Sequence, residues 1–228
     1  MFLDKKVWNH QLYMILSAIF VASLVTCNLI ANKFVSIDLG FKTFIVSAGI
    51  LPYPITFLVT DILSEIYGRK KANRVVVSGF IASIFTVIFL WIGAQFQSIS
   101  GSPVGDSEYN QVFQNAWRVI LASMIAYLSA QLIDVRVFHF WKNLTKGKHL
   151  WLRNNASTVF SQLIDTTLVV SILFIGVWDR SQILSAIIDG WLFKMLVAFI
   201  DTPLFYLSSW YLKKSFSLKI NEQLDEDF

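Results

Sequence analysis

Residues 54–74 read PITFLVTDILSEIYGRKKANR, an apolar run that encloses two acids and ends in a cluster of cations. Asp61 and Glu65 lie one helical turn apart on the same face, and four cations follow Gly68. Carboxylates inside a stretch of membrane-spanning length are unfavourable in lipid and usually have a function. The stretch therefore predicts a membrane helix with two functional acids, whose basic end faces the cytoplasm.

The composition of the whole chain supports a membrane protein. Of 228 residues, 55% are hydrophobic and 15% are charged, with a mean hydropathy of +0.58. Soluble domains carry about 25% charged residues, and several runs here exceed the roughly 18 apolar residues that indicate a spanning helix. These runs are continuous and do not alternate, which argues against a β-barrel. We predict an all-α integral membrane protein.

The apolar runs predict one domain over residues 1–228, built as a bundle of six transmembrane helices. The spans are expected at approximately 11–31, 43–67, 74–97, 117–138, 155–178 and 183–212. Pro52 and Pro54 should break or kink the second span in its outer half. The third span is almost wholly apolar and is expected to face lipid.

The distribution of positive charge predicts the orientation. Lys and Arg gather in the N-terminal segment, the 68–74 loop, the 136–153 loop and the C-terminus, and the alternate segments carry few. The positive-inside rule then places both termini in the cytoplasm, in a multi-pass protein of the inner membrane. The net charge of +4 is mild, so we expect contact with lipid headgroups and no nucleic-acid partner. A homodimer is one assembly that the sequence permits.

Metal, disulfide and cofactor chemistry find little support in the sequence. Cys27 is the single cysteine, which excludes an internal disulfide and a cysteine metal cluster. His10, His139 and His149 lie in separate basic or interfacial segments and form no metal site. We expect no cofactor and no catalytic residues.

The two acids of the opening stretch differ in depth. Asp61 lies eight residues from Arg69, roughly 12 Å along a helix, and is expected inside the hydrocarbon, where it would bind substrate. Glu65 is closer to the basic loop, and a coupling or gating role is its functional interpretation. The alternative for both is a place in the inner headgroup layer, where they would neutralise the cations that follow.

The fifth and sixth spans carry deeper polar residues. Ser157, Ser161 and Asp165 recur every four residues and form one polar face, flanked by Thr166. An unpaired acid near the bilayer centre is unfavourable by roughly 2.5 to 3.5 kcal/mol, so Asp165 should face the bundle interior, for binding or for helix packing. Asp201 is the comparable acid of the sixth span. Lys194 lies too far from Asp201 for direct contact, and we expect it to pair with an acid on another helix, Asp165 or Asp61.

Three further polar residues are expected in the interior. Gln131 and Asp134 end the fourth span, where an ion pair of Asp134 with Arg136 is the alternative. Asn28 can both donate and accept hydrogen bonds, with interhelical packing as its alternative. Tyr53, Phe57 and Phe160 would add aromatic walls. Such an interior suits a small, flat, neutral or weakly cationic heterocycle, because aromatic rings stack on bases and carboxylates bind their donor edges.

Four motifs resemble one family in order and spacing. TDILSEIYGRKKA, AYLSAQLIDVRVFHFWK, AST followed by SQLIDTTL, and FKMLVAFIDTPLFY together look like the queuosine precursor transporter family, also called the vitamin uptake transporter family. The resemblance covers nearly the whole chain. It implies a six-helix inner-membrane protein that imports a 7-deazaguanine precursor of queuosine, of the preQ0 and preQ1 class, for tRNA modification. Its typical positions are Asn28, Thr60, Asp61, Gln131, Asp134, Ser157, Asp165, Thr166, Lys194 and Asp201.

The resulting hypothesis is a secondary carrier for a small purine-like molecule, with two alternatives. One is a substrate-binding membrane subunit that works with an energy-coupling module, since the chain has no ATP-binding P-loop of its own. The other is an intramembrane aspartyl protease, which the absence of a Gly-x-Gly-Asp element makes remote.

Overall fold

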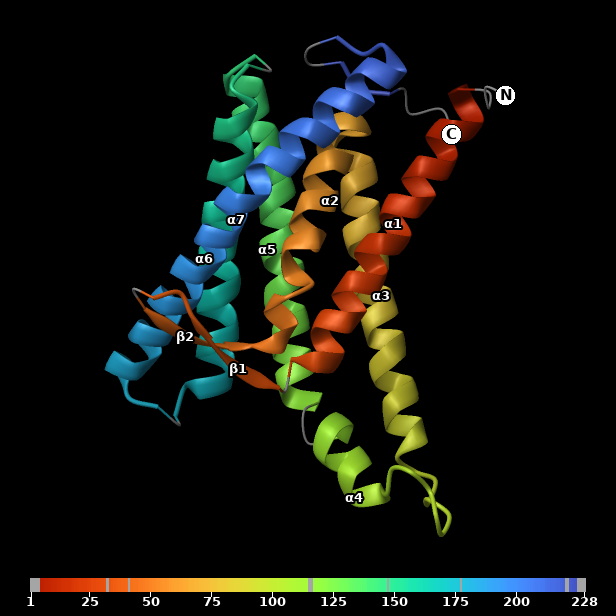
Figure 1. Ribbon diagram of the computed structural model, residues 1–228, viewed down its shortest axis with the longest axis vertical. Coiled ribbons are helices and arrows are strands. Elements are labelled where there is room, and N and C mark those ends of the chain that lie inside the picture. The colour runs from red at the N-terminus through yellow and green to blue at the C-terminus, as the bar shows by residue number, and fades with distance from the viewer. Residues whose placement is uncertain are drawn as a thin grey trace.

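The computed structural model describes residues 5–31, 33–40, 42–114, 117–146, 148–176, 178–219 and 222–224. Most of them form long helices packed side by side (Figure 1). In chain order the helices are α1 (Lys5–Ile30), α2 (Tyr53–Ile66), α3 (Gly68–Gly93), α4 (Asp106–Tyr109), α5 (Trp117–Leu144), α6 (Leu150–Phe174) and α7 (Arg180–Phe216). A short π-helical turn, η2 (Asn110–Gln114), links α4 to the region before α5.

Five segments among the described residues are long and apolar enough to cross a membrane. They are Val7–Ile30, Ala48–Ile66, Gly68–Gly93, Leu121–Leu144 and Arg180–Phe216. Helix α6 is not among them, and it carries the polar face predicted from Ser157, Ser161 and Asp165, all of which are buried. The mainly helical membrane fold is thus supported. The helices extend beyond several predicted ends, most clearly α3, which begins at Gly68 because that glycine takes a φ of +82° and permits a tight turn.

The predicted helix over 43–67 is wrong in its first part. Strands β1 (Phe34–Asp38) and β2 (Thr43–Ser47) pair antiparallel, with Phe34 opposite Ser47. A 3-10 turn, η1 (Ala48–Ile50), follows, and α2 begins only at Tyr53. Pro54 therefore falls in the first turn of α2, where a missing N–H breaks no helical bond. The break expected at the prolines is confirmed, and β-branched residues before it pair as strands.

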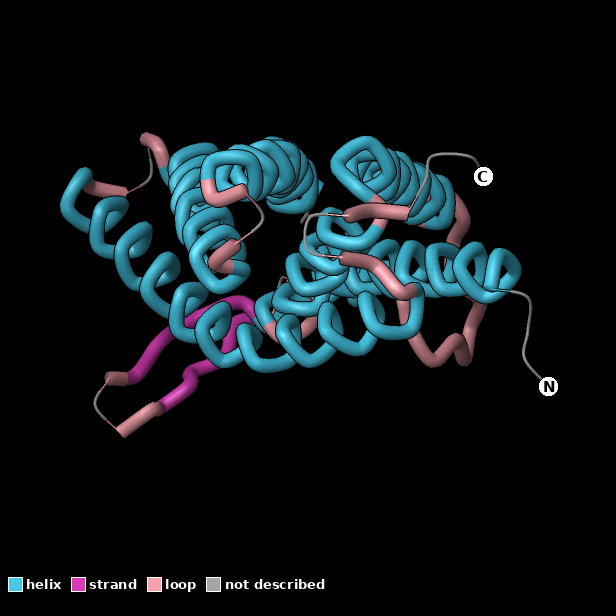
Figure 2. Tube along the Cα trace, turned by 90° about the horizontal axis from the view of Figure 1, so that it is seen from above, coloured by secondary structure: helices cyan, strands magenta, loops and turns pink. Residues whose placement is uncertain are grey.

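The hairpin packs against α7 at one side of the bundle (Figure 2). Phe44 and Val46 of β2 form a small apolar cluster with Phe193 of α7, and the Phe44 and Phe193 ring centroids are 5.1 Å apart. At the end of β2, the Ser47 hydroxyl donates to the carbonyl oxygen of Ala31 at 2.6 Å. These contacts fix the hairpin to both α1 and α7.

The main core joins the two ends of the sequence. Phe20 of α1, Leu63 of α2, Phe138 of α5 and Phe205 of α7 are all at most 1% exposed. By contrast, α3 exposes large apolar side chains along its length, including Ile81, Phe85, Phe89 and Trp91. That face has the character expected of a helix in contact with lipid.

Gly49 lies in η1, which passes close to the end of α1. A methyl group there would lie 2.6 Å from the backbone oxygen of Cys27. We therefore expect Gly49→Ala to destabilise the protein by about 1 to 3 kcal/mol, measured as a lower melting temperature in detergent. Leu51→Ala is the control, because the Leu51 side chain is 66% exposed. An unchanged melting temperature for Gly49→Ala would contradict this packing.

Candidate functional site

A cavity of about 280 Å³ lies in the half of the bundle away from the chain termini. Its wall comes from the last turns of α1, the end of β2, η1, the start of α2 and facing parts of α5, α6 and α7. The start of α1 and the end of α7 lie at the other end of the molecule (Figure 1). Most of the lining is apolar. Its polar side chains are Cys27, Asn28, Ser47, Tyr53, Ser123, Tyr127, Asp165, Thr166 and Lys194.

Asp165 is the centre of the polar wall. Its Oδ2 atom accepts a hydrogen bond from the Tyr53 hydroxyl at 2.7 Å and lies 2.5 Å from the Lys194 ammonium. That ammonium also lies 4.5 Å from the centroid of the Tyr53 ring, a cation–π contact. The three side chains come from α6, α2 and α7, so this cluster fixes the relative positions of three helices.

The cavity also presents hydrogen-bonding groups that protein partners leave available. All hydrogen bonds that described residues make to the Asp165 carboxylate go to Oδ2, which leaves Oδ1 to accept from a ligand. The buried Thr166 hydroxyl has no hydrogen-bond partner in the described part of the chain. Asn28 donates to Ser83 at 3.3 Å through Nδ2, so its carbonyl oxygen can still accept. A ligand with several N–H donors fits this wall.

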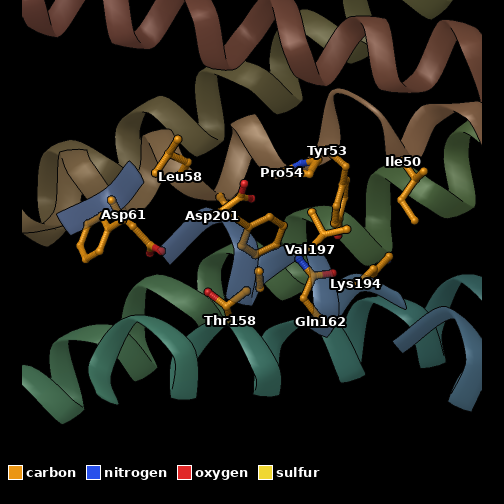
Figure 3. A pocket seen from close by; sticks show the side chains of 13 residues that line it. Ile50, Tyr53, Pro54, Leu58, Asp61, Thr158, Gln162, Lys194, Val197 and Asp201 are labelled. Carbon is orange, nitrogen blue, oxygen red and sulfur yellow. The ribbon is translucent and has the colours of Figure 1, made fainter. Parts of the chain in front are cut away.

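A second, smaller cavity of about 30 Å³ continues from the first toward the termini. Figure 3 shows Asp61 at one end and Lys194 at the other, with Asp201, Thr158 and Gln162 between them. Ile50, Tyr53 and Lys194 line both cavities, and Tyr53 and Lys194 supply the polar part of the partition between the two. The small cavity has room for water and enough polar groups to hold it, but not for an organic ligand.

Beyond the small cavity, a buried polar network joins α2, α5 and α6. Gln131 donates to the Thr60 hydroxyl at 2.8 Å. Asp134 accepts from the Ser161 hydroxyl at 2.9 Å, and Ser157 and Asp61 lie beside it. Asp134 thus points into the bundle. The predicted alternative, an ion pair with Arg136, is wrong, because Arg136 is exposed on the other side of the helix.

Glu65 lies one helical turn beyond Asp61 on α2, about 6 Å nearer the end of the bundle where the chain begins and ends. Its side chain is completely buried and paired with Lys213 of α7, and its Oε2 lies 3.4 Å from the Lys142 ammonium of α5. A place in the headgroup layer was the alternative considered for this residue, and it stays a prediction. Within the protein, Glu65 ties three helices together at the end of the bundle that holds the termini.

The predicted site residues therefore separate into three layers. Asn28, Asp165, Thr166 and Lys194 meet at the large cavity, and Asp61 and Asp201 line the small one. Thr60, Gln131, Asp134 and Ser157 form the polar network behind it, with Glu65 beyond. Asp61 lies eight residues after Tyr53, about 12 Å along α2, so a small ligand bound at Asp165 does not also contact Asp61.

The sequence reasoning missed part of the cavity wall. Val46, Ser47 and Gly49 line it, and they lie in a segment predicted to be helical. Tyr53 was expected as an aromatic wall, but not as a donor to Asp165. Its position between Pro52 and Pro54, where α2 begins, is the sequence feature that could have indicated a special role for this side chain. Phe160, predicted to line the interior, is 51% exposed and faces outward.

Comparisons with known proteins give the family. The family model described as "Putative vitamin uptake transporter" matches residues 47–208. The "Probable queuosine precursor transporter" of Bacillus subtilis (strain 168) is 31% identical over 69% of each chain. The "Queuosine precursor transporter" of Escherichia coli (strain K12) is 29% identical over 82% of this chain and 76% of its own. No solved structure matches. The chain belongs to the vitamin uptake transporter family.

Proposed function

We propose that this protein is a secondary carrier that brings a 7-deazaguanine precursor of queuosine across the cytoplasmic membrane. The observation that carries the proposal is the large cavity with the Asp165 carboxylate in its wall. The names of the curated relatives support the same cargo. At about 280 Å³ the cavity is near the lower end of the roughly 300–1,000 Å³ range of small-molecule sites, which suits a single bicyclic ring.

Cargo recognition follows from the groups that face the cavity. A guanine-like edge carries N–H donors, and one of them would donate to Oδ1 of Asp165, the atom that described residues leave available. Asn28 and Thr166 would bind further polar groups of the ring. The Tyr53 and Tyr127 rings, whose centroids are 5.6 Å apart, would supply aromatic surface beside it. An arrangement of this kind binds a ring by its edge and its face together.

The proposed topology has six spans, α1, α2, α3, α5, α6 and α7, with both termini in the cytoplasm. The basic 68–74 stretch and the two lysines in the last turn of α7 would then lie on the cytoplasmic side. The large cavity would lie toward the outer face, and the Glu65 cluster would close the inner face. Opening of that cluster, together with movement of the Tyr53 and Lys194 partition, would release cargo inward.

Complementation tests the proposed function directly. A bacterial strain that cannot synthesise the precursor and lacks its own carrier should regain queuosine in its tRNA when it expresses this protein and receives external precursor. The measured quantity is the queuosine content of the tRNA. Uptake by liposomes that contain this protein alone would show that no ATP-hydrolysing module is needed. No queuosine despite membrane expression of the protein would refute the proposal.

A further inference from the structure

We infer that Lys194 makes the large cavity selective for uncharged cargo, so that a neutral deazaguanine binds in preference to its cationic amine derivative. This inference rests on the proposed function, because it concerns the cargo of the same cavity. Asp165 and Lys194 are the two charged residues among the described side chains that line the cavity, and they neutralise each other. The site therefore offers a ligand hydrogen-bonding groups without a net charge.

The position of the Lys194 ammonium is fixed by two contacts. It lies 2.5 Å from Oδ2 of Asp165 and 4.5 Å from the centroid of the Tyr53 ring. The Lys194 and Asp165 side chains are only 15% and 4% exposed, so water screens the pair weakly. A positive charge is thus held at the cavity wall beside the one carboxylate that a cationic cargo could use.

The other charged groups near the cavity do not replace that carboxylate. Asp61 and Asp201 line the small cavity, on the other side of the partition that Tyr53 and Lys194 form. Asp189, next to Gly190 at the outer end of α7, is paired with Lys42. Glu65 lies beyond the polar network with its two lysines. Each of these acids is separated from the large cavity or already has a cationic partner.

A neutral cargo and a cationic cargo should therefore bind the large cavity with different free energies. A neutral ring donates an N–H to Oδ1 of Asp165 and leaves the ion pair at Oδ2 intact. A ring with an ammonium group brings a second positive charge close to Lys194 in a weakly screened cavity. Repulsion between like charges in such a setting should lower the affinity by about tenfold or more. Removing the Lys194 charge should shift the preference toward the cation, because Asp165 then carries an uncompensated negative charge.

Two probes of nearly the same shape test this inference. 7-Cyano-7-deazaguanine is neutral, and 7-aminomethyl-7-deazaguanine carries an ammonium group at neutral pH. Their affinities for the purified full-length protein should be compared by competition, first for the wild type and then for Lys194→Met, which keeps the length of the side chain. Lys42→Met is the matched control, because it also removes a lysine paired with an aspartate, but outside the cavity lining.

The expected result is an affinity about tenfold or more higher for the cyano compound in the wild type and in Lys42→Met. In Lys194→Met this ratio should fall at least tenfold. Equal affinities in the wild type would overturn the inference, and so would an unchanged ratio in a folded Lys194→Met protein. The wild-type ratio is a test that needs no variant. If the wild type binds neither compound, the proposed function itself is wrong. If it binds both with equal affinity, only the inference about Lys194 is wrong.

Discussion

Asp165→Asn is expected to reduce precursor uptake by about a hundredfold or more. Two effects combine, and both come from the loss of one negative charge. The Lys194 ammonium loses the carboxylate that lies 2.5 Å away, and removing one partner of a buried ion pair typically costs about 3 to 5 kcal/mol. The cargo also loses a charged acceptor, and hydrogen bonds to charged groups contribute about 1.5 to 3 kcal/mol. The asparagine keeps the shape of the side chain.

The measurement is initial uptake into liposomes, together with the queuosine content of tRNA in the complementation strain. Asp189→Asn is the matched control, since Asp189 is also paired with a lysine but does not line the cavity. Its uptake should stay close to that of the wild type. Melting temperatures of both variants separate loss of cargo binding from loss of fold. Wild-type uptake by a folded Asp165→Asn protein would remove Asp165 from the cargo site.

The buried acids could be located from the sequence because lipid penalises charge. Asp61, Asp134 and Asp165 stand in apolar runs, and all three are at most 3% exposed in the structure. Recurrence every four residues also placed Ser157, Ser161 and Asp165 on one buried face. One-dimensional patterns thus identify which residues point inward, since an unpaired charge has no favourable place on the lipid side.

Contacts between helices were harder to predict. The sequence limited the partner of Lys194 to Asp165 or Asp61, and the structure pairs it with Asp165. Choosing between them requires the relative depth of α2, α6 and α7, which no pattern within one helix supplies. Glu65 shows the same limit, because its partners Lys142 and Lys213 come from two other helices. In the sequence, the cations at 69–74 were the nearer candidates.

The hairpin was missed because apolar content outweighed strand pattern. Residues 43–51 are apolar enough to read as the start of a span, and only the β-branched residues with Gly40 before them indicated a turn between strands. Gly40 takes a φ of +80°, which suits the reversal between β1 and β2. A hairpin in a membrane protein needs partners for its backbone groups, and the pairing of β1 with β2 satisfies those that face each other.

Glu65→Gln is expected to destabilise the protein by about 3 to 5 kcal/mol. The Glu65 side chain has no exposed surface and lies against two lysines, so the substitution removes the carboxylate from both at once. Lys213→Met should destabilise less, because the contact between Glu65 and Lys142 remains. The double variant Glu65→Gln with Lys213→Met should lose less stability than the sum of the two single losses, since the two residues interact directly.

Cys27 allows the stability of these variants to be measured simply, because it is the one cysteine and is buried. A thiol-reactive dye that fluoresces on reaction then reports unfolding in detergent from a single site. Lys214→Met is the matched control, since Lys214 is an exposed neighbour that lies over the Trp210 ring. Equal melting temperatures for Glu65→Gln and Lys214→Met would contradict the role of Glu65 as the tie between α2, α5 and α7. If the Glu65 cluster is also the inner gate, liposomes that contain Glu65→Gln should release preloaded cargo faster than liposomes with the wild type. The comparison is made at a temperature below the melting temperature of the variant.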